Sequence, residues 1–123
     1  MTTILVVDDE FLIADILGMA LEDEGYMVVF ASNGKRALEV LARERAGLVI
    51  TDFMMPIMNG MELAQHIKSR PETASLPIIL MSGAQAHIAN RHPELFDAVY
   101  DKPFDIDVLI ARVAELVGHP SAD

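Results

Sequence analysis

The chain has 123 residues, of which 52% are apolar, and its 19 acidic and 9 basic side chains give a formal charge of −10. This length and composition predict one globular domain, and the excess of acids disfavours direct DNA or RNA binding. No apolar stretch reaches the length of a membrane span and no secretion signal is recognisable, so we expect a cytoplasmic protein that does not contact the membrane.

Five short apolar runs predict strands. They occupy residues 4–7, 27–31, 48–50, 78–81 and, more weakly, 98–100. Runs of this length without polar alternation are typical of parallel strands that are covered on both faces.

Apolar stripes with helical spacing separate these runs. The first predicted helix ends at Gly25, the second follows a turn at 32–34, and the third follows the N-cap Asn59. The last predicted helix begins after the N-cap Asp105 and ends at Gly118. The segment 84–91 is the weakest helix prediction. The alternation predicts an α/β fold, a (βα)5 doubly wound three-layer sandwich with a five-stranded parallel sheet. Residues 1–118 are expected to form this domain and 119–123 a disordered C-terminal tail.

Polar side chains follow four of the five predicted strands. Asp8 and Asp9 follow the first, Asp52 the third, Ser82 the fourth and Lys102 the fifth. Because ligands of open α/β sheets bind beyond the carboxyl ends of the strands, we expect these side chains to converge. One lysine cannot neutralise three acids, and an oxygen-only donor set favours Mg²⁺, with Mn²⁺ also possible. Such a site suits a phosphoryl group, with Asp52 as the nucleophile.

Four short motifs together resemble the receiver domain of two-component response regulators over essentially the whole chain. They are VVDDE at 6–10, TDFMMPIMNG at 51–60, MSG at 81–83 and DKPF at 101–104. The resemblance implies a flavodoxin-like sheet with strand order 2-1-3-4-5. It also implies a stand-alone, chemotaxis-regulator-like signalling domain rather than an enzyme, with self-phosphorylation and autodephosphorylation as its only reactions.

The same resemblance implies a role for each matching residue. Asp52 is similar to the phosphoacceptor that takes a phosphoryl group from a histidine kinase or a histidine phosphotransfer protein. Ser82 and Lys102 match the residues that contact the phosphoryl group, and Pro103 matches a proline preceded by a cis peptide bond. The metal ligands that the resemblance implies are Asp8 (through a water), Asp9, Asp52 and the backbone carbonyl of Met54.

One position departs from the family pattern. The aromatic switch residue is usual three positions before the lysine, where this chain has Val99, followed by Tyr100. Adjacent strand residues point to opposite faces, which argues against Tyr100 as a replacement. Phosphorylation is still expected to change the binding of an unknown effector protein through the face of the fourth helix, fifth strand and last helix. The domain is expected to be a monomer or a phosphorylation-dependent dimer.

Alternatives stay open at this point. A Mg²⁺-dependent aspartyl-phosphate phosphohydrolase commonly has a second acid two residues after the nucleophile, where this chain has Met54. A receiver-like interaction module that is never phosphorylated is disfavoured by the complete set of acids. Asp8 and Asp9 could also be a helix N-cap pair.

Overall fold

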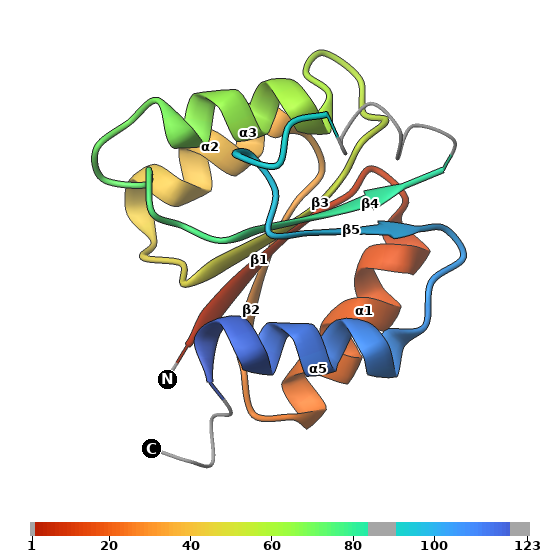
Figure 1. The fold of residues 1–123 in the computed structure, drawn as a ribbon. Helices are drawn as coiled ribbons and strands as arrows, with labels where there is room; N and C mark the ends of the chain where they lie inside the picture. The colour runs from red at the N-terminus through yellow and green to blue at the C-terminus, as the bar shows by residue number, and fades with distance from the viewer. Residues whose placement is uncertain (1, 84–90, 119–123) are drawn as a thin grey trace.

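A computed structural model of the chain describes residues 2–83 and 91–118. Its five parallel strands form one sheet in the order β2-β1-β3-β4-β5 (Figure 1). The strands are β1 (Thr3–Val7), β2 (Met27–Ala31), β3 (Leu48–Asp52), β4 (Ile78–Ser82) and β5 (Ala98–Asp101). The described helices are α1 (Phe11–Asp23), α2 (Gly34–Arg43), α3 (Gly60–Lys68) and α5 (Ile106–Val117). The predicted doubly wound fold and strand order are confirmed.

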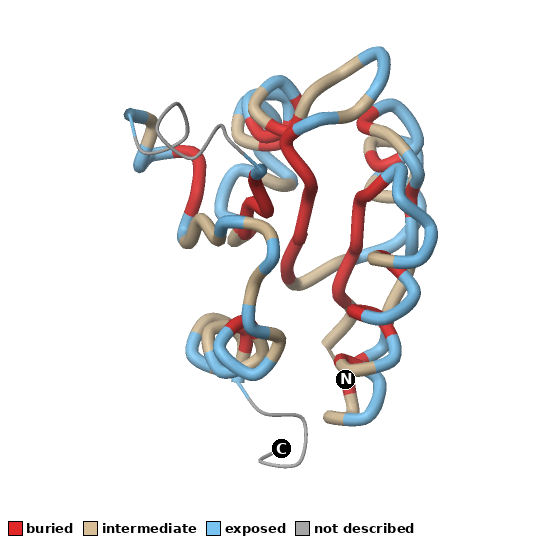
Figure 2. The backbone as a smooth tube through the Cα atoms, turned by 90° about the vertical axis from the view of Figure 1, so that its right-hand side faces the viewer, coloured by how far each residue is buried: buried red, intermediate tan, exposed pale blue. Residues whose placement is uncertain are grey.

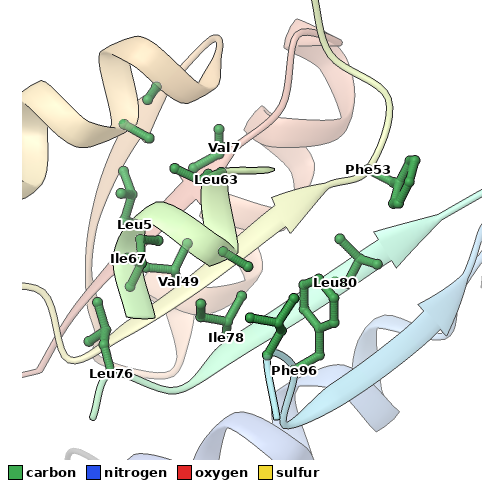
Figure 3. Close-up of a cluster of buried hydrophobic side chains, with 14 residues drawn as sticks. Leu5, Val7, Val49, Phe53, Leu63, Ile67, Leu76, Ile78, Leu80 and Phe96 are labelled. Atoms are coloured by element: carbon green, nitrogen blue, oxygen red, sulfur yellow. The ribbon is translucent and has the colours of Figure 1, made fainter. Parts of the chain in front are cut away.

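Two apolar cores lie on opposite faces of the sheet. Helices α1 and α5 cover one face, and α2 and α3 cover the other (Figure 1). In β1, Ile4 and Val6 pack toward α1 and α5, whereas Leu5 and Val7 pack toward α2 and α3. Both sets of side chains are buried, so the strand sequences are apolar without alternation. Figure 2 shows the buried strands between helices with exposed outer surfaces, and Figure 3 shows the core on the α3 side.

The helix limits follow the predicted capping residues. At the start of α3, Asn59 Oδ1 accepts the Glu62 N–H at 2.8 Å, and the Glu62 carboxylate accepts the Asn59 N–H at 3.0 Å. At the start of α5, Asp105 accepts the Asp107 N–H at 2.9 Å. Gly25 follows α1 with a φ of 101°, a conformation typical of a glycine just after a helix.

Two predicted segments cannot be compared with the structure. The predicted helix at 84–91 lies outside the described residues except for its last residue, and the predicted tail at 119–123 lies wholly outside them. Among the described residues, every helix is too short or too polar to traverse a lipid bilayer.

Candidate functional site

Asp8 and Asp52 lie side by side because of the register between β1 and β3. Val7 pairs with Thr51, so the residues that follow them occupy matching positions at the carboxyl ends of neighbouring strands. Only 3% of the surface of Asp8 and 4% of that of Asp52 is exposed. The predicted convergence of strand ends therefore produces a buried pair of carboxylates.

Lys102 brings a positive charge to this pair from beyond β5. Its Nζ lies 3.2 Å from Asp52 Oδ1, 3.4 Å from Asp8 Oδ2 and 3.6 Å from Glu10 Oε1. The backbone that carries it is held by a hydrogen bond from the Lys102 N–H to the Ser82 carbonyl at 2.6 Å. The peptide bond between Lys102 and Pro103 is cis, as predicted.

Glu10 is the third carboxylate of the site, and it is not among the residues predicted from the sequence. One oxygen each from Asp8, Glu10 and Asp52 lie within 4.8 Å of one another, and we call these three residues the carboxylate cluster. Glu10 itself is exposed, and its N–H donates to Asp8 Oδ1 at 2.8 Å. The only signal in the sequence is that Glu10 is the third consecutive acid of the VVDDE motif.

The other predicted site residues are placed differently. Asp9 is exposed and is not a member of the carboxylate cluster, so its role as a direct metal ligand stays a prediction. Ser82 is fully buried at the end of β4, the strand that pairs with β3. The Met54 side chain is exposed, and the role of its carbonyl also stays a prediction. The N-cap alternative for Asp8 and Asp9 is wrong, because Glu10 occupies that position of α1 and its side chain makes no capping hydrogen bond.

The cluster carries more negative charge than Lys102 offsets. Burial raises the pKa of Asp52, the charge of Asp8 raises it further, and Lys102 only partly opposes this. Burial also raises the pKa of Asp8, against the hydrogen bond from Glu10 and the charge of Lys102. Burial lowers the pKa of Lys102, but the carboxylates of Asp52 and Asp8 outweigh this effect and leave it raised. A hard divalent cation with oxygen ligands, such as Mg²⁺, fits this donor set.

Val99 and Tyr100 point to opposite faces of the sheet, as predicted. Val99 packs against the core on the α2 and α3 side, whereas Tyr100 packs against the core on the α1 and α5 side. Tyr100 therefore lies on the opposite face of the sheet from position 99, where the family pattern has its aromatic residue.

Comparison with known proteins identifies the family. Residues 4–114 match the sequence profile of the response regulator receiver domain. The chain belongs to the response regulator receiver family. This receiver is 33% identical over 118 residues to the probable transcriptional regulatory protein TcrX of Mycobacterium tuberculosis, an alignment that covers 94% of the receiver and 49% of TcrX. It is 39% identical over 115 residues to an uncharacterized 14.6 kDa protein of Leptolyngbya boryana, covering 91% of the receiver and 87% of that protein.

The receiver spans about half the length of TcrX and of a probable transcriptional regulatory protein of Picosynechococcus, 49% and 48% respectively. Solved structures agree with the family. Response regulator TrrA of Thermotoga maritima, in complex with Mg²⁺ and BeF, is 34% identical with a TM-score of 0.84, covering 94% of the receiver and 99% of TrrA. A putative response regulator of Chloroflexus aurantiacus is 28% identical with a TM-score of 0.87, covering 96% and 98%. The flavodoxin-like receiver fold is confirmed, and the matches give the hydrolase alternative no support.

Proposed function

We propose that this receiver accepts a phosphoryl group on Asp52 from the phosphohistidine of a histidine kinase or a histidine phosphotransfer protein. The observation that carries the proposal is the 3.2 Å contact between Lys102 Nζ and Asp52 Oδ1 inside the carboxylate cluster. Burying the Asp52 carboxylate raises its pKa and therefore costs folding free energy. Residues that are retained despite such a cost are typical of functional sites. The proposed domain comprises residues 1–118.

The transfer forms one bond and breaks one. An Asp52 oxygen bonds to phosphorus while the bond between phosphorus and the donor's imidazole nitrogen breaks, and that nitrogen leaves with the electron pair and takes up a proton. The Lys102 ammonium offsets the negative charge on the phosphoryl oxygens, and the Ser82 hydroxyl donates a hydrogen bond to them.

The carboxylate cluster is proposed to hold Mg²⁺, or Mn²⁺ in its place. Asp8, Glu10 and Asp52 supply oxygen ligands, and Asp9 and the Met54 carbonyl are further proposed ligands. When bound, the ion offsets negative charge on the phosphoryl oxygens and on the acids. TrrA, which is similar in sequence and fold, is known in complex with Mg²⁺ and BeF, which supports this assignment.

The phosphorylated domain is proposed to act as a signal rather than as an enzyme. Phosphorylation changes the binding of a downstream effector protein, as yet unknown, through the face formed by the predicted fourth helix, β5 and α5. The only hydrolysis that we assign to it is slow loss of its own phosphoryl group. We further propose a cytoplasmic location and a monomer that is able to dimerise when phosphorylated.

Incubation with acetyl phosphate and Mg²⁺, followed by intact-mass measurement, tests the proposal. We expect one added phosphoryl group on the wild type, none on Asp52→Asn and none when EDTA removes the metal. Asp101→Asn is the matched control, because Asp101 is an exposed acid at the end of β5, and it keeps the label. Repeated turnover of unrelated phosphoesters would support the hydrolase instead, and absence of label with metal bound would support an unphosphorylated module.

A further inference from the structure

A threonine interrupts the apolar sequence of β3 directly before Asp52. Thr51 is fully buried. Because strand residues alternate between faces, its side chain lies on the same side of the sheet as that of Val49, which packs in the core on the α2 and α3 side (Figure 3). A hydroxyl in such a place costs free energy unless it forms a hydrogen bond, so its partner is of interest.

The partner of the Thr51 hydroxyl is the backbone carbonyl of Asp52. Thr51 Oγ1 lies 2.9 Å from the Asp52 carbonyl oxygen. The Met55 sulfur, at 4.0 Å from the same hydroxyl, is a much weaker acceptor. A hydroxyl has one proton to donate, and we assign it to the carbonyl. The bond therefore ties a core side chain to the backbone of the proposed phosphoacceptor.

The Asp52 carbonyl lies beyond the pairing between β1 and β3, which ends at Val7 and Thr51. The Phe53 N–H of the same peptide points to the Met81 carbonyl of β4, so the Asp52 carbonyl points away from β4. Among the described residues, no backbone N–H outside the strand ladder donates to it. A buried carbonyl without a donor is unfavourable, and the Thr51 hydroxyl supplies that donor.

Three contacts fix the peptide group that joins Asp52 to Phe53. Its carbonyl accepts the Thr51 hydroxyl, and its N–H donates to the Met81 carbonyl at 2.9 Å. Gly60 packs so closely that a methyl group on it would lie 2.5 Å from the same carbonyl oxygen. Because this peptide group is bonded to the Asp52 Cα, fixing it also fixes the point from which the Asp52 carboxylate extends.

We propose that Thr51 is a positioning residue for phosphoryl transfer, whose hydroxyl holds the Asp52 carboxylate in the orientation in which it attacks phosphorus. This inference rests on the proposed phosphorylation of Asp52. Thr51 does not touch the phosphoryl group, because adjacent strand residues point to opposite faces, so it acts only through the Asp52 backbone. A reacting group misplaced by about 1 Å can cost on the order of 100-fold in rate, so the bond matters beyond its contribution to folding.

The test separates the hydroxyl of Thr51 from its methyl group. Thr51→Ser keeps only the hydroxyl, Thr51→Val replaces the hydroxyl by a methyl group, and Thr51→Ala has neither. Val49→Ala is the matched control, because Val49 is fully buried on the same face of the same strand and has no polar atom in its side chain. Each protein is incubated with acetyl phosphate over a range of Mg²⁺ concentrations. Intact-mass measurement gives the rate of labelling, and thermal unfolding gives the Tm.

We expect labelling to follow the hydroxyl, whereas stability follows both groups. At saturating Mg²⁺, Thr51→Val and Thr51→Ala should be labelled about tenfold more slowly than the wild type, and Thr51→Ser and Val49→Ala within about twofold of its rate. The Mg²⁺ concentration that gives half of the maximal rate should be the same in all five proteins. The Tm of all four variants should fall, by roughly 3 °C or more, because each loses a buried contact or hydrogen bond.

Labelling rates that follow the Tm, with Thr51→Ser or Val49→Ala as slow as Thr51→Val, would overturn the inference, because stability rather than the hydroxyl would then set the rate. Wild-type rates in Thr51→Val and Thr51→Ala would overturn it too, as would a higher requirement for Mg²⁺ at an unchanged maximal rate. If Thr51→Val does not fold, the pair Thr51→Ser and Thr51→Ala still differs by the hydroxyl alone. Failure of acetyl phosphate to label the wild type would instead contradict the proposed function itself.

Discussion

The Nζ atom of Lys102 lies 3.2 Å from Oδ1 of Asp52, across the width of β4, which separates β5 from β3 in the sheet. This contact is one of three that a single ammonium makes with carboxylates. Two unit charges about 4 Å apart interact by roughly 4 kcal/mol at an effective dielectric near 20, so repulsion among the acids is a large term that one lysine offsets only in part. The site is therefore arranged for a further positive charge.

Replacing Asp52 by asparagine should stabilise the metal-free protein. The change removes one of three negative charges that share Lys102, and burial already disfavours the charged form of Asp52. We expect a gain of about 1 kcal/mol in the free energy of unfolding and a Tm higher by roughly 3–6 °C in a domain of this size. Thermal unfolding in EDTA at pH 7 measures it. Asp101→Asn is the exposed control and should leave the Tm unchanged. A lower Tm for Asp52→Asn would show that Lys102 alone offsets the negative charge of the carboxylate cluster when no metal is bound.

The contribution of Asp8 and Asp52 to stability should fall as the pH rises from acid toward neutral. The pKa values of Asp8 and Asp52 are raised above their ordinary value of 3.8, so between that value and the raised ones the folded state binds more protons than the unfolded state. The contribution of these two acids to the free energy of unfolding then decreases with pH across this window and levels off above the raised pKa values.

The measurement is urea unfolding in EDTA between pH 4 and pH 8, compared with the double variant Asp8→Asn/Asp52→Asn. The wild type should lose stability relative to the double variant as the pH rises. Because Mg²⁺ binds the deprotonated acids, its stabilising effect should be small near pH 4 and should grow toward pH 8. An effect of Mg²⁺ that is equal at both pH values would contradict the role of these two acids.

Replacing Lys102 by methionine should separate metal binding from phosphoryl transfer. The variant keeps an unbranched side chain but removes the ammonium that competes for the carboxylates, so we expect Mg²⁺ to bind several-fold more tightly. Labelling by acetyl phosphate should slow by at least about tenfold, because the charge that offsets the phosphoryl oxygens is gone. Titration calorimetry and intact-mass kinetics measure the two effects. Faster labelling, or weaker Mg²⁺ binding, would be the opposite of this expectation.

Adding one methyl group at Gly60, which is not itself a site residue, should displace the backbone of Asp52. In Gly60→Ala the new carbon would lie 2.5 Å from the Asp52 backbone oxygen and 3.0 Å from the Phe53 Cα, and neither backbone atom can move freely. We expect a cost of about 1–3 kcal/mol in the free energy of unfolding, and slower labelling of Asp52.

Gly34→Ala is the matched control for Gly60→Ala. Both glycines are the first residue of a helix, but the three atoms nearest to a methyl group at Gly34 all belong to the side chain of Met58 rather than to backbone. Gly34→Ala should therefore cost less than Gly60→Ala in urea unfolding and leave labelling unchanged. Equal costs for the two variants would mean that the backbone beside Asp52 gives way as easily as the Met58 side chain.

Most of the fold could be predicted from the sequence because buried strands have apolar sequences, and of the four charged residues that the structure brings together the sequence indicated all except Glu10. The apolar runs predict the strands, although β3 and β4 extend through the polar residues Asp52 and Ser82, because Asp52 still pairs with β4 and Ser82 with β5. The position of Lys102 beside Asp52 follows from the rule that ligands bind at strand ends.

The features that could not be predicted depend on the backbone conformation of the loops. Glu10 has an exposed side chain, and only the turn after β1, closed by its N–H bond to Asp8, brings its carboxylate back to Lys102. The positive φ of Ile57 has no signal in the sequence, because glycine or asparagine is the usual mark of a turn with a positive φ.

Locating the label on the chain tests the central claim most directly. The protein is incubated with acetyl phosphate and Mg²⁺, the acyl phosphate is reduced with borohydride to convert the modified aspartate to homoserine, and tandem mass spectrometry locates that residue. We predict homoserine at position 52 only, and none when Mg²⁺ is left out. Homoserine at Asp8 or Asp9, or a phosphoryl group carried by another residue while Asp52 stays unmodified, would contradict the account.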